Sequence, residues 1–445
     1  MQPETAPSST DAWRVLGLLF AANLINFFDR TIPAILVEPI RLEWGLSDLQ
    51  LGLLTAAFTV VYAVAGVPLG RLADTGERRK VMGWSLAVWS GFTALNGLAW
   101  SYASFFVMRM GVGIGEAGCA PAANSLIGDL FPAEKRARAT GIFMLGLPLG
   151  LLLAFFTTGA MVSAFGTWRA PFFVAAVPGL ILAVFLYRMK EPVRGAGEKQ
   201  ASAGKPVEQP IRKLLSIRTL LWLILSGVTV NFASYAGNGF LVPMLQRYFG
   251  LELGQAAVVT GCMVGLTGLV GLTAGGWLAD VLHQRSEVGR LRFGALSLFL
   301  ASIGTGAALW SGDGSLQLFA WLFGLGWLAL YSYYTCVYPA IQDVVEPRLR
   351  GTAIAIYFAG MYLLGGAFGP VVVGGLSDRL ALRAMEAAGA SEMDEAFKAT
   401  GLHDAMFLIP VTLLLTAFFI WMASRHFAAD ARHMQQQLEA GTPAP

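Results

Sequence analysis

The sequence predicts an all-α membrane protein with twelve transmembrane helices arranged in two pseudo-symmetric six-helix bundles. Of its 445 residues, 56% are hydrophobic and only 13% are charged, whereas about a quarter of the residues of a soluble domain are charged. Apolar runs of about 20 residues, the length that crosses a bilayer core, recur along the whole chain. The short alternating segments typical of a transmembrane barrel do not occur, so the spans are expected to be helices.

The apolar runs also give the domain organisation. Twelve spans can be placed, at about residues 13–39, 49–70, 81–100, 103–128, 140–162, 170–188, 217–246, 255–279, 291–310, 315–340, 352–373 and 405–424. A polar stretch rich in glycine, proline and charge separates the sixth span from the seventh, and this composition is typical of a flexible linker. The predicted parts are an N-terminal bundle (1–189), a cytoplasmic linker (190–215), a C-terminal bundle (216–425) and a cytoplasmic tail (426–445).

The distribution of basic residues predicts the orientation. Most of the 31 Lys and Arg residues fall in the N-terminal tail, in the loops that follow even-numbered spans and in the C-terminal tail. Cytoplasmic segments carry the excess of Lys and Arg in membrane proteins. Both termini are therefore expected to be cytoplasmic, in a multi-pass protein of the cell (inner) membrane.

The two halves repeat one another in sequence. GRLAD at Gly70–Asp74 closes the second span, and GWLAD at Gly276–Asp280 closes the eighth. After the fourth span, Asp129–Arg136 begins with an acid and ends with an arginine, and Asp343–Arg350 does the same after the tenth. Because both pairs fall at equivalent places in a six-plus-six scheme, duplication is the economical explanation.

Several motifs carry a resemblance to a known family. GRLADTGERRK, at Gly70–Lys80, resembles the signature loop of the major facilitator superfamily. Within that superfamily, NFFDR on span one, RMGVGIGEAG at Arg109–Gly118 and LFPAEKRARATG at Leu130–Gly141 are similar to Spinster-like lysolipid and sphingolipid transporters, here in a bacterial homologue. The resemblance covers the chain in span count, linker and loop placement, and it implies the major facilitator fold with alternating access between its bundles. Thr75 and Glu77 depart from the signature, which leaves the details of a gate open.

The signature loop predicts a gate at the cytoplasmic side. Asp74 lies near the C-terminal end of its helix, where the helix dipole disfavours a negative charge, so it needs a positive partner. Arg78, Arg79 or the N-terminus of a span from the other half could supply one, and the resemblance implies span eleven. Such a contact would act as a latch that breaks when the cytoplasmic side opens; alternatively, the basic residues only anchor the loop at anionic headgroups. The predicted gate residues are Gly70, Asp74, Arg78, Arg79, Arg136, Asp280 and Arg350.

Away from the interfaces, four ionisable residues lie within the spans: Asp29 and Arg30 on span one, and Arg109 and Glu116 on span four. Charges at this depth cost at least about 2.5–3.5 kcal/mol each, so they are expected to face the bundle interior or a wet cavity and to pair with one another. By helical rise, Asp29 is expected to pair with Arg109. Glu116, in an apolar glycine-rich stretch, is the better proton carrier, and Asp29 joins it in proton coupling when its partner is drawn away. Arg30 could meet Glu116 in one state or an anionic headgroup in another. The alternative is a static network that joins the two spans.

The second half carries candidate residues for a substrate cavity. They form a polar face on span seven and a tyrosine-rich series on span ten, namely Asn231, Ser234, Tyr235 and Asn238, then Tyr331, Tyr333, Tyr334, Thr335 and Tyr338. Such a neutral, aromatic and hydrogen-bonding wall, opposite a charged one, suits an amphipathic molecule with an ionic head. Tyrosine clusters also occur as interfacial belts and as hydrogen-bonding contacts between helices.

These observations predict a proton-coupled secondary active transporter of a small, lysolipid-like substrate, embedded in the bilayer as a monomer. No ATP-binding GxxxxGK[ST] loop and no metal-ligand spacing occurs in the sequence, so no catalysis, cofactor, metal or nucleic-acid partner is expected. Three alternatives stay open: an organic anion/proton symporter, which would bind carboxylates through Arg30 and Arg109; a multidrug efflux pump; and a receptor or scaffold that binds without transport.

Overall fold

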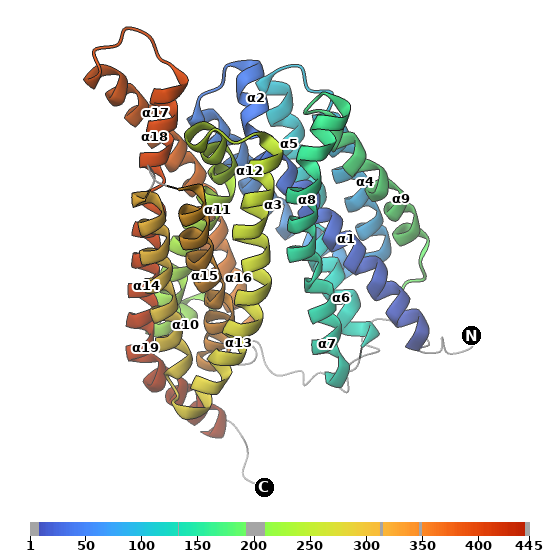
Figure 1. Cartoon of the computed structure of the whole chain (residues 1–445). Coiled ribbons are helices and arrows are strands. Elements are labelled where there is room, and N and C mark those ends of the chain that lie inside the picture. The colour runs from blue at the N-terminus through green and yellow to red at the C-terminus, as the bar shows by residue number, and fades with distance from the viewer. Residues whose placement is uncertain (1–8, 132, 193–209, 312–314, 347–348, 441–445) are drawn as a thin grey trace. The chain divides into compact units, whose positions relative to one another are not determined.

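The computed structural model describes residues 9–131, 133–192, 210–311, 315–346 and 349–440, and within these ranges every regular element is a helix. The chain separates into two compact units (Figure 1). Unit 1 comprises Met1–Leu46, Leu54–Gly204 and Glu252–Gly261, and unit 2 comprises Ser47–Leu53, Lys205–Leu251 and Cys262–Pro445. Residues 193–209 of the predicted linker lie outside the described part of the chain.

Unit 1 is built around two helices. Its elements are α1 (Ser9–Ile35), α2 (Val37–Trp44), all but the first turns of α3 (Asp48–Thr75), α4 (Arg78–Asn96), α5 (Tyr102–Ala117), α6 (Cys119–Leu130), α7 (Ala133–Met144), α8 (Gly146–Phe165), α9 (Ala170–Arg188) and α12 (Leu253–Thr260). Helix α1 packs against α8 and α9, and α4 packs against α5 and α9.

Unit 2 is organised around α11, which packs against α19 and against a π-helical turn at Gly360–Gly366. Its elements are α10 (Pro210–Leu215), α11 (Arg218–Phe249), α13 (Thr267–Arg285), α14 (Gly289–Trp310), α15 (Leu316–Val344), α16 (Arg350–Ala359), α17 (Phe368–Ala387), α18 (Glu395–Ala405) and α19 (Leu408–Ala440). A second π-helical turn, at Gly261–Leu266, joins α12 to α13. Part of the predicted tail, from residue 426 to Ala440, continues α19 as helix.

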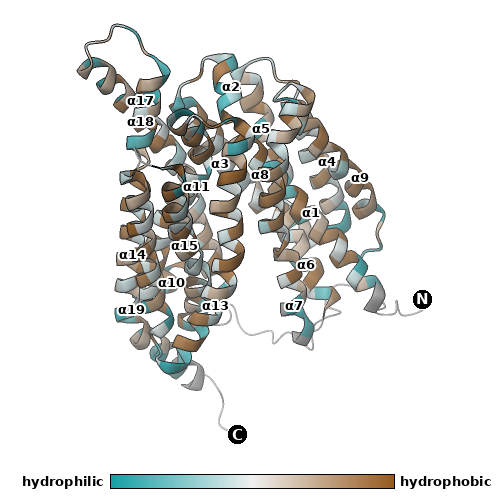
Figure 2. Ribbon diagram, in the orientation of Figure 1, coloured by the Kyte–Doolittle hydropathy of each residue, from teal (hydrophilic) through white to brown (hydrophobic). Residues whose placement is uncertain are grey.

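The helices have the length and composition of membrane spans. Ten helical stretches among the described residues are long and apolar enough to cross a bilayer. The other two predicted spans coincide with α4, which begins Arg-Arg-Lys, and with α5 followed by α6. All twelve predicted spans therefore fall on helices or on consecutive helices. Figure 2 shows hydrophobic residues along the long helices and hydrophilic residues gathered at helix ends and in α7.

Each unit fixes its first long helix by the same polar contact. In unit 1, the Asn23 side chain on α1 donates a hydrogen bond to the Phe143 carbonyl at 2.8 Å. In unit 2, the Asn231 side chain on α11 donates to the Met361 carbonyl at 2.9 Å. Because these helices hold equivalent places in the two halves, the contact supports the duplication inferred from the loop motifs.

A pair of glycines accompanies each asparagine. On α8 they are Gly146 and Gly150, and at the start of α17 and in the turn before it they are Gly369 and Gly365. A methyl group on Gly150 would lie 2.4 Å from the Leu24 carbonyl oxygen, so the two helix backbones touch. Close approach through small residues is a general way to pack helices in membranes, where the hydrophobic effect drives little association.

We expect Gly150→Ala to lower the thermal stability of the protein. The added methyl would overlap the α1 backbone, and overpacking of this kind costs about 1–3 kcal/mol. The matched control is Gly141→Ala on α7, because no atom lies within 4 Å of the added methyl there. Thermal unfolding of both variants in the same detergent tests this, and equal melting temperatures would contradict it.

Candidate functional site

The ionisable residues predicted within the first half gather in unit 1. Glu116 on α5 accepts two hydrogen bonds from Arg30 on α1, from Nη2 at 2.6 Å and from Nε at 3.0 Å. The Glu116 side chain is fully buried and the Arg30 side chain is 16% exposed. An ion pair in such apolar surroundings is held by both charge and hydrogen bonds, and removing one partner leaves the other charge buried alone.

Aromatic rings of α3 hold the two arginines of this cluster. The Arg30 guanidinium carbon lies 4.7 Å from the Tyr62 ring centroid and 5.2 Å from that of Phe58. The Arg109 guanidinium carbon lies 4.7 Å from the same Phe58 ring. The faces of aromatic rings attract cations, so Phe58 stabilises both guanidinium groups. Neither ring was predicted as part of the site, because an apolar residue on an apolar helix carries no distinguishing signal.

The predicted ion pair between Asp29 and Arg109 is not formed. Instead, Asp29 Oδ2 accepts hydrogen bonds from Trp89 Nε1 at 3.1 Å and from Thr93 Oγ1 at 3.4 Å. Helix α4 supplies both donors. It can lie this close because Gly115 on α5 has no side chain, and a methyl there would lie 2.5 Å from the Trp89 backbone nitrogen. Depth along the two helices was not enough to predict which faces meet.

Both acids of the cluster keep one oxygen without a hydrogen bond. Asp29 Oδ1 and Glu116 Oε1 are buried and have no hydrogen-bond partner among the described residues. A buried carboxylate oxygen without a donor is costly, and a proton on that oxygen removes the charge that makes it so. The cluster therefore has two positions at which a proton can be taken up.

The predicted gate residue Arg78 is buried, with its side chain 1% exposed. It forms an ion pair with Asp129 at the end of α6, and its Nε donates to Glu191 at 2.8 Å. Its Nη2 also donates to the Pro192 carbonyl at 2.8 Å. Arg78 thus joins the start of α4 to the ends of α6 and α9 within unit 1, and a lone role in anchoring the loop at headgroups does not fit this burial.

The other gate residues of the first loop have weaker or undescribed surroundings. Arg79 donates from its side chain to Glu77 at 2.9 Å and to the Met189 carbonyl at 3.1 Å. A methyl on Gly70 would make only ordinary contact with Pro121, at 3.9 Å. The side chain of Asp74 lies outside the described residues, so the predicted latch stays a prediction.

The second half repeats the arrangement at Arg78 with a residue that we did not predict. Arg290, near the start of α14, lies between Asp280 and Asp343, with both nitrogen–oxygen distances at 3.3 Å. The Asp280 side chain is 69% exposed and the Asp343 side chain 40%. The repeat did not indicate Arg290, because it comes ten residues after Asp280, whereas Arg78 comes four residues after Asp74.

Arg136 and Arg350 make the same local contact in the two halves. Arg136 Nη2 donates to the Gly128 carbonyl at 2.7 Å, and Arg350 Nε donates to the Gln342 carbonyl at 3.0 Å. In each half, the accepting residue comes directly before the aspartate that pairs with Arg78 or with Arg290. Both side chains therefore cap the end of the preceding helix, where backbone carbonyls lack partners within the helix.

The polar stripe predicted on α11 is divided between two roles. Asn231, 2% exposed, is used in packing against the Gly360–Gly366 turn. Ser234 is 7% exposed, and the Tyr235 ring contacts the Tyr362 ring with centroids 6.2 Å apart. The side-chain oxygen of Asn238 is buried and has no hydrogen-bond partner in the part of the chain that the structure describes. Asn238 is therefore better placed than Asn231 to bind another molecule.

The predicted tyrosines of α15 begin a longer aromatic series in unit 2. Tyr334 lies between Tyr331 and Tyr338, with ring centroids 6.3 Å and 5.7 Å away. From Tyr338 the series continues to Phe358 at 5.8 Å, and from Phe358 to Tyr362 at 6.0 Å. Phe358 and Tyr362 were not predicted, because two aromatic residues in an apolar span carry no signal that separates them from packing residues.

A neighbouring tyrosine belongs to the helix packing instead. Tyr333 is completely buried, and its hydroxyl forms hydrogen bonds with the hydroxyls of Tyr357, at 2.7 Å, and Ser226, at 3.0 Å. It joins α11, α15 and α16, as buried polar side chains do between membrane helices. The tyrosines of α15 thus have two roles: Tyr331, Tyr334 and Tyr338 form the aromatic series, and Tyr333 joins the helices by hydrogen bonds.

Comparison with known proteins places this architecture in a family. Residues 19–370 match the family model described as Major Facilitator Superfamily. The chain is 28% identical to an MFS-type efflux pump of Mycolicibacterium smegmatis, over 94% of each chain. It is 24% identical to the sphingosine-1-phosphate transporter SPNS2 of Xenopus tropicalis, over 95% of this chain and 83% of that protein.

A solved structure agrees with the sequence relatives. The crystal structure of a bacterial homologue of the human lysosomal transporter Spinster, in an inward-facing and unoccupied conformation, superposes with a TM-score of 0.86. It is 27% identical and the match covers 95% of this chain and 99% of that one. The chain therefore belongs to the Major Facilitator Superfamily, is Spinster-like within it, and is a transporter rather than an enzyme.

Proposed function

We propose that the protein is a proton-coupled secondary active transporter that moves an amphipathic, lysolipid-like substrate by alternating access. It works as a monomer in the cell (inner) membrane with both termini in the cytoplasm. The observation that carries the proposal is the buried ion pair between Arg30 and Glu116, beside a second buried acid, Asp29. Intramembrane ionisable residues of this kind commonly mark ion and substrate pathways.

The ion pair offers a physical route to coupling. When the anionic headgroup of a substrate takes the Arg30 guanidinium, Glu116 loses its partner and is left as a buried, uncompensated charge. That state is strongly disfavoured, so Glu116 takes up a proton as the substrate binds. Substrate and proton are then loaded together and released together, which makes the coupled movement a symport. Asp29, held by Trp89 and Thr93, is a second proton acceptor in the same cluster.

The aromatic series of unit 2 suits the apolar part of such a substrate. Tyr331, Tyr334, Tyr338, Phe358 and Tyr362 supply five aromatic rings for apolar contact, and four of them also carry a hydroxyl group. Ligand sites generally combine a mostly apolar wall with a few well-placed polar groups. The similarity to proteins named as a sphingosine-1-phosphate transporter and a Spinster homologue favours a lipid with a single chain and a charged head.

The signature loop belongs to the same proposal as a cytoplasmic gate. Asp74 is the proposed latch, which forms and breaks as the cytoplasmic side closes and opens. Arg78 and Arg290 act as fixed supports, because each holds two acids at the helix ends around it. The polar ends of helices thereby keep their shape while the latch itself changes partner.

An organic anion symporter is the second candidate, and Arg109 favours it. Within the described ranges, its guanidinium has no ion-pair or hydrogen-bond partner and lies only over the Phe58 ring. A carboxylate of a small organic acid would satisfy it, and a bidentate arginine–carboxylate contact is a strong one.

Uptake into proteoliposomes separates these proposals. The purified protein would be given a labelled lysophospholipid with a phosphate headgroup, or a labelled sugar acid, with and without an imposed pH gradient. We expect accumulation of the lysophospholipid that a protonophore removes. Lysophospholipid uptake that ignores the gradient would contradict proton coupling, and gradient-driven uptake of the sugar acid alone would favour the organic anion symporter.

A further inference from the structure

Two continuous helical stretches, α3 and the stretch from α12 to α13, have residues in both units. The first residues of α3, Ser47–Leu53, belong with unit 2, whereas Leu54 onwards belongs with unit 1. Conversely, Glu252–Gly261, which contains α12, belongs with unit 1, whereas α13 belongs with unit 2. These two helix starts are equivalent in the repeat, because GRLAD lies in the last turns of α3 and its second copy, GWLAD, lies in the last turns of α13.

The two equivalent attachments differ in chemistry. At α12 the contact is between glycines: a methyl on Gly159 of α8 would lie 2.5 Å from the Gly254 Cα. At α3 the corresponding contact to α17 also uses a glycine, since a methyl on Gly374 would lie 2.2 Å from the Asp48 carbonyl oxygen. There, however, charged and polar side chains are added around the glycine.

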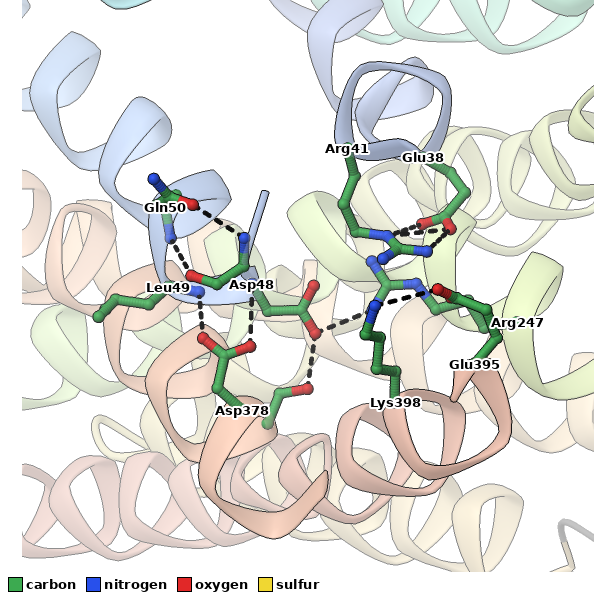
Figure 3. A network of polar contacts seen from close by, with 11 residues as sticks. Glu38, Arg41, Asp48, Leu49, Gln50, Arg247, Asp378, Glu395 and Lys398 are labelled. Carbon is green, nitrogen blue, oxygen red and sulfur yellow. Dashed lines mark hydrogen bonds and ion pairs between the residues drawn. The ribbon is translucent and has the colours of Figure 1, made fainter. Parts of the chain in front are cut away.

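Asp378 of α17 caps the start of α3 (Figure 3). Its Oδ1 accepts from the Asp48 backbone N–H at 3.0 Å, and its Oδ2 accepts from the Leu49 N–H at 2.9 Å. Backbone N–H groups in the first turn of a helix have no partner within the helix, and the helix dipole favours a negative charge there. The carboxylate therefore satisfies both needs from a different helix.

A buried ion pair completes this contact. The Asp48 side chain accepts from Arg247 Nη1 of α11 at 2.9 Å and from Ser377 Oγ at 2.7 Å (Figure 3). The side chains of Asp48 and Arg247 are only 4% and 3% exposed. We call the four residues Asp48, Arg247, Ser377 and Asp378 the α3 cap.

The residues of α17 in the cap form a third copy of the loop motif. Gly374–Asp378 reads GGLSD, which shares glycine, leucine, a small residue and aspartate with GRLAD at Gly70–Asp74 and GWLAD at Gly276–Asp280. In the orientation proposed above, the first two copies lie near cytoplasmic helix ends, whereas the third lies within α17 on the external side. In the third copy, the glycine permits close helix contact and the aspartate caps the neighbouring helix.

We propose that the α3 cap is a releasable lock of the transport cycle, which holds the first turns of α3 on α17 in one state and lets them go in another. The proposal rests on the transport function proposed above. A glycine-on-glycine contact has no group that water can take over. The cap instead consists of charges and backbone N–H groups at a helix end that the proposed orientation places at the aqueous surface, where water can replace each hydrogen bond on release.

Accessibility of a cysteine under the cap tests the proposal. Ser377 is 1% exposed, so in a Cys262→Ser background a Ser377→Cys reporter should react slowly with a membrane-impermeant thiosulfonate reagent. Cys119 and Cys336 are buried and stay in place. We expect the reaction to accelerate when lysophospholipid is added to the otherwise unchanged protein. A rate that does not respond to the substrate, in protein shown to transport it, would overturn the proposal.

Asp378→Asn should raise the same rate about 2- to 30-fold, the factor equivalent to the loss of a helix cap. The matched control is Asp394→Asn, because Asp394 caps α18 by accepting from the Phe397 N–H at 3.0 Å and takes no part in the α3 cap. Equal rates for the two variants would contradict the proposal. At a fixed pH these rates do not depend on proton coupling, so a transporter that ignores the pH gradient could still pass this test.

A cross-link tests whether release is needed for transport. In the double variant Asp48→Cys, Ser377→Cys, oxidation should form a disulfide across the cap, stop uptake and allow full recovery after reduction. The single Ser377→Cys variant, oxidised in the same way, should keep its uptake. Continued turnover by fully cross-linked protein would show that the cap is a static contact.

Discussion

Glu116→Gln is expected to abolish accumulation driven by a pH gradient while the protein still folds and exchanges substrate. The amide has the shape of the protonated acid but cannot release a proton, so substrate binding and proton uptake are no longer linked. For one proton per substrate, a gradient of one pH unit supports about tenfold accumulation, and the variant should reach a ratio of about one. Labelled substrate in proteoliposomes measures both values.

The same variant also tests the alternative, in which the cluster is a static network that joins two helices. If the Arg30–Glu116 pair only joins α1 and α5, Glu116→Gln should lower expression and thermal stability and leave the pH response of the surviving protein intact. The control is Glu395→Gln, because Glu395 is 55% exposed and pairs with Lys398 within its own helix. It should leave accumulation and stability unchanged.

Arg78→Leu should cause the largest loss of stability in unit 1. The change leaves Asp129 and Glu191 without their common partner, and their side chains are only 14% and 24% exposed. Breaking a buried ion pair by removing one partner costs about 3–5 kcal/mol. Thermal unfolding in detergent, followed by the fluorescence of the native tryptophans, would measure the shift.

The second half supplies the control for this prediction. Arg290→Leu removes the corresponding arginine, but Asp280 and Asp343 are 69% and 40% exposed. Ion pairs in contact with water contribute about 0–1 kcal/mol, so this variant should unfold close to the wild-type temperature. Equal losses for the two variants would mean that Arg78 stabilises the fold through packing alone.

The sequence was sufficient for the fold because the membrane imposes it. Apolar length and the requirement for internal hydrogen bonding restrict a spanning segment to helix, and the repeated loop motifs add the two-fold organisation. The residues of the charged cluster were also predictable, since Asp29, Arg30, Arg109 and Glu116 are the ionisable residues in apolar spans. Each of these predictions depends on a free-energy penalty that acts throughout the bilayer core. One penalty is for unpaired backbone groups, and the other is for buried charges.

Partners within the cluster were not predictable in the same way. The partners of Asp29 depend on the rotation of α4 about its axis and on the space left by Gly115, and neither leaves a trace in hydropathy. Trp89, Phe58 and Tyr62 read as ordinary apolar residues until the helices are packed. The α3 cap was missed for a related reason: Asp48 lies at a helix start, where an acid is unremarkable, and Asp378 lies beyond the end of the predicted eleventh span.

The π-helical turn at Gly360–Gly366 has a consequence for the history of the molecule. The carbonyl that accepts from the helix asparagine comes three residues before the first packing glycine in unit 1, between Phe143 and Gly146, but four residues before it in unit 2, between Met361 and Gly365. A widened turn of this kind accommodates one additional residue in a helix and is frequent at functional sites. After the duplication, the two copies therefore came to differ in length by one residue at this point, and the π-helical turn accommodates that difference in the second copy.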